Sequence, residues 1–352
     1  MKALRWYAKG DIRLEDIKEP SPGEGEVKVK VKWCGICGGD INAYEIGSPA
    51  IPTKKPHPRT GKMAPIVLGH EFSGDVAAVG SGVSHVKVGD RVTVRPTIVC
   101  YNCYWCKKGQ TVQCSTLATI GLAGDGAFAS YMVAPSDCIF PIPEKLSYEV
   151  ASFCEPLAVC IHGCKRGGLK PGETAAIVGA GPIGLLQIQA AKAAGASKVF
   201  VIEPLANRRE LAKKLGATEV FDPIKVDVGK EIGKLTNNLR ADVVFECAGP
   251  PSAMMTGLKV CQRGGRIVQI GVFEKAYEFP FAEFWMREQT VTASQGYADE
   301  FPTAIDFLVD GRVRVEPMIS AKMKLGDIIE KGFKELTSGR KADYIKILVS
   351  PE

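Results

Sequence analysis

Hydrophobic and polar residues alternate along several short runs in the first 150 residues or so. The alternation is visible in residues 27–33, 72–79 and 91–94, and Gly, Pro and Asp interrupt the chain between these runs. A period of two is the pattern of a strand that has one face in the core and the other in water. The first part of the chain is therefore predicted to be rich in β-strands.

From about residue 155 to residue 292 the rhythm changes to strand, helix, strand. The sequences TAAIVGA, KVFVIE, EVFD, ADVVFECAG and GRIVQIG are apolar runs of buried-strand length. Helix-like stretches such as PIGLLQIQAAKAAGA and NRRELAKKLGA separate most of them, and each ends at a glycine that can cap a helix. This alternation predicts a parallel sheet with helices on both faces. After about residue 293 a short mixed tail follows, which we expect to return to the first domain.

The composition is that of an ordinary globular protein. The 352 residues, 45 % hydrophobic and 24 % charged, are enough for about two domains. No run of about 18 apolar residues and no apolar amino-terminal signal is present, so we expect a cytoplasmic protein without a membrane span. The net charge of +6 is mild and its lysines are scattered, which argues against a nucleic-acid partner. Twelve cysteines without an export signal indicate reduced thiols or metal ligands more than disulfides.

A glycine fingerprint lies between a predicted strand and a predicted helix, in AAIVGAGPIGLLQ. In a G-x-G-x-x-G motif the first glycine permits a tight turn, the second lets the backbone approach a pyrophosphate, and the third allows close packing of helix on strand. A carboxylate about 20 residues further on accepts the ribose hydroxyls and repels the extra phosphate of NADP. The predicted cofactor is therefore NAD, and Arg208 with Arg209 keeps NADP as the alternative. The predicted cofactor-binding residues are Gly179, Gly181, Pro182, Ile183, Gly184, Glu203 and Arg208.

Four cysteines with the spacing C-x2-C-x2-C-x7-C lie in the sequence CYNCYWCKKGQTVQC. The segment is polar and aromatic and has few core-forming residues, so it cannot fold by burial alone. Four thiolates suit a closed, tetrahedral, structural zinc site. An iron–sulfur cluster is the competing interpretation, although a second cysteine set and a following proline are usual there. The four residues are Cys100, Cys103, Cys106 and Cys114.

A second set of possible metal ligands is dispersed along the chain. Cys37 follows a predicted strand, His70 and Glu71 are adjacent in VLGHEFSG, and Glu155 precedes a proline. One thiolate, one imidazole and one or two carboxylates could make an open zinc site. Taken singly, each also has a structural interpretation: Cys37 in the core, His70 capping a turn and Glu155 as an acid at a helix start.

Together, GHEFSGDVAAVGSGVSHVKVGDRV, the four-cysteine loop, EPLAVCIHGCKRGG and the glycine fingerprint resemble the zinc-dependent medium-chain dehydrogenase family along nearly the whole chain. The resemblance implies an α/β fold in which residues 154–292 form an NAD-binding Rossmann domain with a doubly wound parallel sheet. It implies that residues 1–153 and 293–352 form a GroES-like β-barrel catalytic domain, with two zinc ions per subunit. Cys37, His70, Glu71 and Glu155 would then lie at the catalytic zinc, and Cys100, Cys103, Cys106 and Cys114 would bind the structural zinc.

Within that family the Glu155-Pro156 pair resembles the polyol and diol branch, which includes sorbitol and 2,3-butanediol dehydrogenases. The implied activity is hydride transfer between a secondary alcohol, a vicinal diol or small polyol, and NAD, with zinc as the Lewis acid. The long stretch between Cys37 and His70 is most similar to butanediol dehydrogenases. Sorbitol dehydrogenase-like or L-threonine 3-dehydrogenase-like activity is the alternative. Family analogy also implies a homo-oligomer, a dimer or tetramer.

One stretch departs from the family pattern. Relatives commonly read C-G-S/T-D-x-H, in which the hydroxyl takes the alcohol proton and the histidine passes it toward solvent, but this chain has Gly39 and Asn42. A water in the space of the missing hydroxymethyl group could substitute, with Glu71 or Glu155 as the eventual acceptor. His162 is a further candidate acceptor, although a helix histidine bonded to a neighbour explains it better. The missing hydroxyl also leaves a non-enzymatic alternative, a protein that binds NAD and zinc without catalysis.

Overall fold

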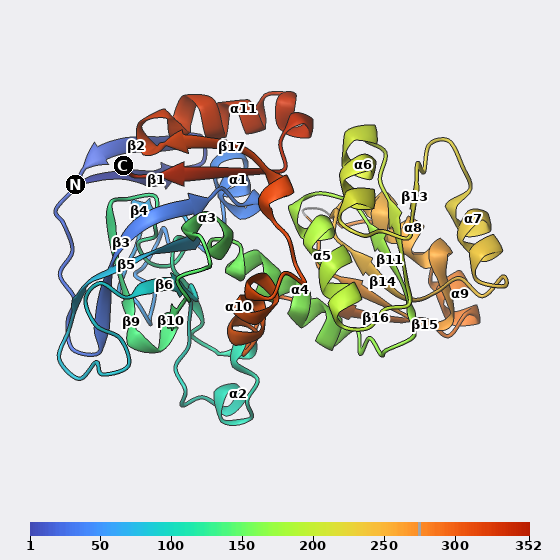
Figure 1. Ribbon diagram of the computed structural model, residues 1–352, viewed down its shortest axis with the longest axis horizontal. Coiled ribbons are helices and arrows are strands. Elements are labelled where there is room, and N and C mark those ends of the chain that lie inside the picture. The colour runs from blue at the N-terminus through green and yellow to red at the C-terminus, as the bar shows by residue number, and fades with distance from the viewer. Residues whose placement is uncertain (274–275) are drawn as a thin grey trace. The chain divides into compact units, whose positions relative to one another are not determined.

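The computed structural model describes residues 1–273 and 276–352, which form two compact units (Figure 1). The first unit comprises Met1–Glu155, Phe301–Val309 and Val315–Glu352, and the second comprises Pro156–Glu300 and Asp310–Arg314. The domain boundaries expected after residues 153 and 292 stay a prediction. Within the described residues, no helix is both long enough and apolar enough to cross a membrane.

The first unit is built on a mixed sheet with strand order β10-β6-β5-β3-β18-β17, in which β9 also pairs with β3. Its central strand, β3 (Glu26–Gly35), buries Val27, Val29 and Val31 and turns the intervening lysines outward, as its alternation predicts. The predicted strands at 72–79 and 91–94 are β5 (Glu71–Val79) and β6 (Arg91–Val94). The other strands of this sheet are β9 (Tyr131–Pro135), β10 (Ile139–Pro141), β17 (Ile319–Lys324) and β18 (Lys346–Ser350).

Smaller elements complete the first unit. A second sheet has the order β2-β1-β4, and a two-stranded sheet joins β7 to β8. The strands are β1 (Lys2–Ala8), β2 (Asp11–Asp16), β4 (Ile66–Val67), β7 (Thr97–Ile98) and β8 (Ala118–Thr119), and the helices are α1 (Gly38–Glu45), α2 (Tyr104–Lys107), α3 (Tyr148–Ala151), α10 (Phe301–Val309) and α11 (Lys334–Thr337).

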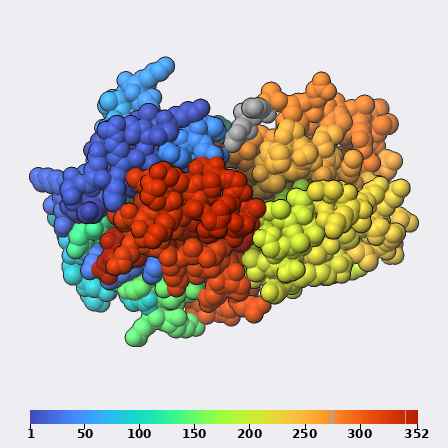
Figure 2. Space-filling model, turned by 90° about the horizontal axis from the view of Figure 1, so that it is seen from above, coloured from blue at the N-terminus to red at the C-terminus, as the bar shows by residue number. Residues whose placement is uncertain are grey.

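The carboxy-terminal strand belongs to the first unit. β18 pairs antiparallel with the end of β3, where Leu348 lies opposite Gly35 and Val349 opposite Cys34. The C-terminal residues, in red, accordingly lie beside the N-terminal residues, in blue (Figure 2). β3 therefore has β5 on one side and β18 on the other, and this three-strand arrangement lies next to the first candidate metal ligand, Cys37.

The second unit contains a six-stranded sheet in the order β13-β12-β11-β14-β15-β16, and every pairing in it is parallel. Successive residues of β11 such as Ala175, Ala176 and Ile177 are all buried, so both faces of the sheet are covered. The predicted doubly wound α/β fold is confirmed. The elements are β11 (Thr174–Val178), β12 (Lys198–Ile202), β13 (Glu219–Phe221), β14 (Ala241–Glu246), β15 (Cys261–Gln269), β16 (Thr290–Ala293), α4 (Cys154–Arg166), α5 (Pro182–Ala193), α6 (Ala206–Lys214), α7 (Val228–Leu235), α8 (Pro251–Val260) and α9 (Phe281–Met286).

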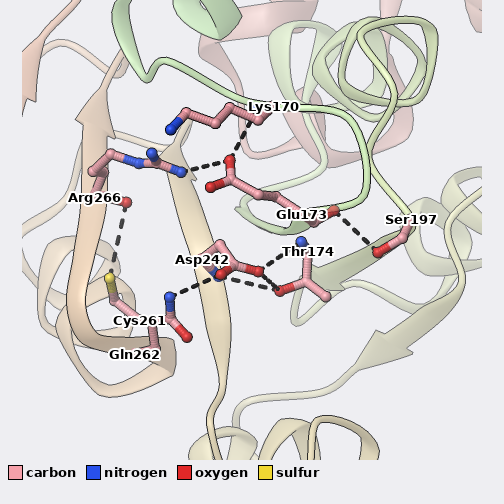
Figure 3. Close-up of polar contacts among 8 residues, drawn as sticks. All are labelled: Lys170, Glu173, Thr174, Ser197, Asp242, Cys261, Gln262 and Arg266. Atoms are coloured by element: carbon pink, nitrogen blue, oxygen red, sulfur yellow. Dashed lines mark hydrogen bonds and ion pairs between the residues drawn. The ribbon is translucent and has the colours of Figure 1, made fainter.

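A polar network ties together the amino-terminal ends of three strands of this sheet (Figure 3). The Asp242 carboxylate accepts hydrogen bonds from Thr174, through its N–H at 2.8 Å and its hydroxyl at 2.7 Å, and from the Gln262 amide at 2.8 Å. Arg266 forms an ion pair with Glu173 at 2.6 Å. The network fixes the starts of β11, β14 and β15, and it leaves their opposite, carboxyl ends for ligands, as is usual in open parallel sheets.

Candidate metal and cofactor sites

The four predicted lobe cysteines come together between β7 and β8. The ligand atoms of Cys100, Cys103, Cys106 and Cys114 all lie within 4.8 Å of one another. The sulfurs of Cys100 and Cys106 are 3.9 Å apart. Two sulfurs bound to one tetrahedral zinc at about 2.3 Å would be about 3.8 Å apart, so the spacing fits a single zinc ion.

Backbone N–H groups point at these sulfurs. Asn102 and Cys103 donate to the Cys100 sulfur at 3.4 Å and 3.2 Å. Such donors lower the pKa of Cys100, and they lower the pKa of Cys103 to about 5. Burial and the neighbouring sulfurs raise the pKa of Cys106 to about 12. All four cysteines can be thiolates at this spacing only when a cation balances their charge, and the donor set fits zinc.

The lobe has almost no apolar core of its own. The aromatic side chains of α2 are exposed, Tyr104 by 65 % and Trp105 by 42 %. Arg95 anchors the lobe to the neighbouring strands by contacts with the Tyr101 hydroxyl at 2.9 Å and the Asp137 carboxylate at 2.7 Å. A metal ion would provide the cohesion that burial cannot supply here.

A second group of three side chains lies at the end of β3. The ligand atoms of Cys37, His70 and Glu71 also lie within 4.8 Å of one another. The pairing of β3 with β5 explains their meeting, because it sets Gly35 opposite Glu71 while Cys37 follows two residues after Gly35. His70 and Glu71 are 6 % and 2 % exposed, and Cys37 is half-buried. A thiol, an imidazole and a carboxylate clustered away from water fit a metal ion better than they fit apolar packing.

Asp40 also belongs to this site, where it organises the turn that begins at Cys37. Its carboxylate is fully buried, accepts a hydrogen bond from the Cys37 N–H at 3.0 Å and lies 3.5 Å from the His70 Nδ1 atom. Burial would lower the pKa of His70, but the nearby Asp40 carboxylate and Cys37 sulfur raise that pKa well above its ordinary value. A carboxylate behind a histidine fixes the orientation of the imidazole ring, which is a common arrangement behind metal ligands. The D of CGGD was the available sequence signal.

Glu155 lies in the first turn of α4 and is half-buried. It is outside the compact group of three found among the described residues. Its charge does reach this region, because it contributes to the raised pKa of Lys346, whose amino group contacts Glu71. Direct zinc ligation by Glu155 stays a prediction.

Gly39 and Asn42 both lie on α1, the helix that Cys37 begins. A β-carbon at Gly39 would lie 3.7 Å from the His70 ring and 3.8 Å from the Cys37 sulfur, which are ordinary contact distances. A β-carbon would therefore fit here without displacing either side chain, and glycine leaves its place unfilled. This position is the one that carries a serine or threonine in the pattern that the chain resembles.

The glycine fingerprint connects β11 to α5 at the carboxyl end of the parallel sheet. Gly179 has a φ of +96°, which favours glycine, and a β-carbon on Gly184 would lie only 1.9 Å from the Gly179 carbonyl oxygen. A β-carbon on Gly181 would meet only the Arg208 guanidinium, at 3.9 Å. The first and third glycines are thus required by the turn and by close packing, while the second leaves the backbone accessible, as phosphate binding requires. Pro182 and Ile183 open the helix.

Glu203 follows β12 and faces this loop. Its carboxylate is buried and accepts hydrogen bonds from the N–H groups of Ala180 at 2.7 Å and Leu205 at 3.0 Å. Arg209 is bound to the carbonyl groups of Glu203 and Pro204, at 2.7 Å and 2.6 Å, and also forms an ion pair with Asp222. The carboxylate is therefore fixed beside the glycine turn, and Arg209 is engaged by protein groups.

His162 lies on α4, where its Nδ1 atom is 3.0 Å from the Glu300 carboxylate. Lys165 reaches the same carboxylate oxygen at 3.0 Å, and the Ala298 N–H donates to the other oxygen at 2.6 Å. Burial would raise the pKa of Glu300, but these contacts lower it to about 2. His162 is thus bonded to a neighbouring side chain, which supports its structural interpretation.

Comparisons with known proteins agree with this geometry. Residues 23–144 match the alcohol dehydrogenase GroES-like domain, and residues 182–310 match the zinc-binding dehydrogenase domain. The chain is 39 % identical to the (R,R)-butanediol dehydrogenase of Bacillus subtilis, over all of both chains, and 35 % identical to the sorbitol dehydrogenase of the same organism, over all of this chain and 97 % of the relative. The crystal structure of 2R,3R-butanediol dehydrogenase from Bacillus subtilis superposes with a TM-score of 0.93, at 39 % identity, covering 100 % of this chain and 99 % of that one.

The matches to the butanediol dehydrogenase cover the full chain and so include both the four-cysteine lobe and the glycine fingerprint. They confirm the predicted combination of a GroES-like domain with a Rossmann domain. They also confirm the predicted enzyme class, since NAD-dependence is the norm of this family. The chain therefore belongs to the zinc-dependent medium-chain dehydrogenases, in their polyol and diol branch, and is an NAD-dependent oxidoreductase.

Proposed function

We propose that this chain oxidises one hydroxyl group of a vicinal diol of the size of 2,3-butanediol, with NAD as hydride acceptor. The observation that carries the proposal is the mostly buried group of Cys37, His70 and Glu71, which lies beside Gly39, where no side chain fills the space next to His70 and Cys37. The similarity to butanediol dehydrogenases over the full chain supports the substrate class.

Cys37, His70 and Glu155 would hold the catalytic zinc, with Glu71 beside it, and the four lobe cysteines would hold a structural zinc. When bound, zinc supplies Lewis-acid chemistry that lowers the pKa of an alcohol, and NAD accepts the hydride from its carbon. Asp40 fixes the His70 ring, and the burial of His70 and Glu71 excludes bulk water from the group. Thiolate, imidazole and carboxylate groups are all common ligands of zinc, so the side chains at both sites suit this metal.

The alcohol proton has no side-chain hydroxyl to receive it at residue 39. The space beside Gly39 is bounded by His70 and Cys37, and a Glu71 carboxylate oxygen lies within 4.8 Å of the ligand atoms of these two residues. A water in that space would connect the reacting group to this carboxylate. Glu71 is the carboxylate placed to accept the proton from that water. This route needs only the unfilled space beside Gly39 and the carboxylate of Glu71, which already lies beside Cys37 and His70.

The glycine loop and Glu203 would hold the cofactor. The N–H groups at the start of α5 would bind the pyrophosphate, and the Glu203 carboxylate would accept hydrogen bonds from the ribose hydroxyls. A buried carboxylate at this place disfavours the 2′-phosphate of NADP. Arg209 cannot easily compensate, because it is bound to Glu203, Pro204 and Asp222, whereas Arg208 lies beside Gly181, where the phosphates would approach.

Initial rates of NADH formation by the zinc-loaded protein test this proposal. The panel consists of the 2,3-butanediol stereoisomers, erythritol, threitol, sorbitol and L-threonine, with NADP in parallel. We expect kcat/KM to be at least tenfold higher for one butanediol stereoisomer than for sorbitol or L-threonine. A preference for sorbitol or threonine would replace the diol assignment, and two bound zinc ions with no turnover of any alcohol would favour a binding protein.

We further propose that the protein is a homo-oligomer that pairs along β16 and works in the cytoplasm. β16 is an edge strand, and α9 just before it exposes Trp285 and Met286, which are 77 % and 60 % exposed. An unpaired edge beside large apolar side chains is suited to a second copy of the chain. No disulfide joins any cysteines of the described residues, as suits a reducing compartment. Sedimentation of Trp285→Glu should give a smaller particle than the parent protein.

A further inference from the structure

A small cavity lies at the amino-terminal ends of β14 and β15 in the parallel sheet. It has a volume of about 240 Å³ and is lined by residues 238–240 before β14, by residues 261–263 at the start of β15, and by Arg287 after α9. Two of the lining residues, Cys261 and Gln262, lie beside the polar network of these strand ends (Figure 3). The glycine turn lies at the carboxyl end of the same sheet, so this cavity is separate from the proposed cofactor site.

Three arginines from different segments of the chain line this cavity, namely Arg240, Arg263 and Arg287. Arg240 donates a hydrogen bond to the Lys259 carbonyl oxygen at 2.6 Å. Arg287 donates to the Leu258 carbonyl oxygen at 3.1 Å, so both side chains are anchored at the end of α8. Arg263 donates in the same way to the carbonyl oxygen of the last residue of α9, at 3.1 Å. Each anchor uses only one of the N–H groups of a guanidinium, which leaves further donors for a ligand.

Few carboxylates balance the three positive charges of this cavity. Glu283 forms an ion pair with Arg287 at 2.9 Å. The charge of Asp227 also reaches Arg240, but its carboxylate caps α7 by accepting hydrogen bonds from two backbone N–H groups. Among the residues that the structure describes, Arg240 and Arg263 form no ion pair. Burial, followed by the charge of Arg287, lowers the pKa of Arg240, so the positive charges crowd one another.

Helix capping explains only part of this arrangement. A cation at the carboxyl end of a helix is stabilised by the helix dipole and by the unpaired carbonyl groups there. Capping accounts for the anchors of Arg240 and Arg287 at α8, but it does not require a third arginine in the same cavity. The backbone of Arg240 has a φ of +80°, a conformation that favours glycine, so the surroundings must hold it. The excess of fixed positive charge indicates an anionic ligand.

We propose that this cavity binds a phosphate group, either as free phosphate or as the terminal group of a phosphomonoester. Pockets for larger ligands usually have about 300–1,000 Å³, so a cavity of this size suits a small anion. Guanidinium groups from three segments match the tetrahedral oxygens of a phosphate, whereas a single arginine already matches a planar carboxylate. The inference is independent of the proposed diol oxidation, because no residue of the cavity belongs to the metal groups or to the glycine turn.

Calorimetric titration of the zinc-loaded protein with inorganic phosphate tests this inference. NAD is present at saturation so that the glycine turn is occupied, and chloride keeps the ionic strength constant. We expect saturable binding at one site per chain, weakened at least tenfold in Arg263→Gln and in Arg240→Gln. The matched control Lys230→Gln/Lys234→Gln removes two positive charges from α7, outside the cavity lining, and it should bind phosphate within twofold of the parent.

Glu283→Gln gives a second readout, which a capping role alone would not change. Without this carboxylate the Arg287 guanidinium loses its ion-pair partner and becomes available to the anion, so phosphate should bind at least threefold more tightly. In this variant and in the arginine variants, kcat and the KM for NAD should stay within twofold of the parent, because the cavity lies at the opposite end of the sheet from the glycine turn.

Methyl phosphate and malonate, titrated under the same conditions, identify the ligand class. Tighter binding of methyl phosphate than of inorganic phosphate would assign the cavity to phosphomonoesters, and the reverse order would assign it to free phosphate. Tighter binding of malonate than of either phosphate would overturn the phosphate assignment.

The inference would also be overturned if the parent protein showed no saturable phosphate binding, or if Arg263→Gln bound phosphate as the parent does. An equal loss of binding in the lysine control would show a general attraction of anions to this unit and would overturn it too. Arg263 is exposed, so its substitution leaves the fold intact. If Arg240→Gln does not fold because its anchor on α8 is lost, Arg263→Gln and Glu283→Gln decide the question.

Discussion

The two candidate metal sites of the first unit are built in opposite ways. The four-cysteine lobe takes all its ligands from one short segment, is mostly exposed and has its four sulfurs arranged for a closed site. The group of Cys37, His70 and Glu71 takes its ligands from different elements and is mostly buried. The first site can form wherever its segment is present, whereas the second exists only after β3 and β5 have paired. A metal ion at the four-cysteine lobe would therefore stabilise the fold. The group of Cys37, His70 and Glu71, in contrast, is brought together by the fold before any metal binds.

The largest expected effect comes from removing one ligand of each site in turn. Cys37→Ser should lower kcat/KM by at least about a thousandfold, a loss of about 4 kcal/mol of transition-state stabilisation. It should reduce zinc from two ions to one per chain and leave the circular dichroism spectrum unchanged, because the fold does not depend on this ion.

Cys103→Ser is the matched change in the lobe. Zinc should also fall to one ion per chain, but here the free energy of unfolding should fall by about 4 kcal/mol, while freshly prepared folded protein retains most of its activity. Urea unfolding and initial rates, measured on the same samples, separate the two sites. Equal losses of stability and activity in both variants would contradict the division of roles.

Asp40→Asn tests whether the Asp40 carboxylate orients the His70 ring for metal binding. The amide keeps the volume but loses the charge that lies 3.5 Å from the His70 Nδ1 atom. Metal affinity or activity should fall about 10–100-fold, the usual range for a partner behind a metal ligand. The lobe has no such partner histidine, so its zinc should be retained. Zinc affinity measured against a competing chelator would show the change, and an unaltered affinity with unaltered activity would exclude an orienting role.

The strands, the glycine turn and the four-cysteine site could be predicted from the sequence, because each has a pattern in consecutive residues that agrees with the fold. The alternation of β3, the strand–helix rhythm, the glycine turn and the cysteine spacing all depend on neighbours in the chain. The pairing of Glu71 with Lys346 and of His162 with Glu300 joins residues far apart in sequence, and no spacing rule connects them. Gly35 shows the limit well, because only the paired strands reveal that a side chain there would displace a carboxylate.

The contact of Glu300 with His162 and Lys165 is a polar group that the fold assembles without a metal. Its expected contribution to the free energy of unfolding is smaller than the effects described above. The pKa of Glu300 falls from 4.5 to about 2, so its stabilising effect is fully present above pH 4.5 and is lost as pH falls toward 2. Glu300→Gln should lower the free energy of unfolding by about 1–2 kcal/mol at pH 7, since the half-exposed Lys165 partner weakens the effect.

Denaturant unfolding of both proteins from pH 7 to pH 2.5 measures this difference. Loss of zinc in acid affects both proteins alike and cancels in the comparison. The difference should shrink steadily below pH 4.5. A difference that is constant with pH would show that Glu300 contributes through packing and not through its charge.

The smallest expected effect is also the one that bears most directly on the proton route. Gly39→Ser adds a hydroxymethyl group where a β-carbon meets the His70 ring at 3.7 Å and the Cys37 sulfur at 3.8 Å, so the fold and both zinc ions should be retained. If a water in this space accepts the alcohol proton, the serine hydroxyl takes the place of that water. We then expect kcat to change in either direction by less than about tenfold. Gly39→Ala is the matched control, because its methyl group excludes water without providing an acceptor. We expect the alanine variant to lose more activity than the serine variant, and equal rates for the two would place the proton acceptor elsewhere, with Glu71 the next residue to test.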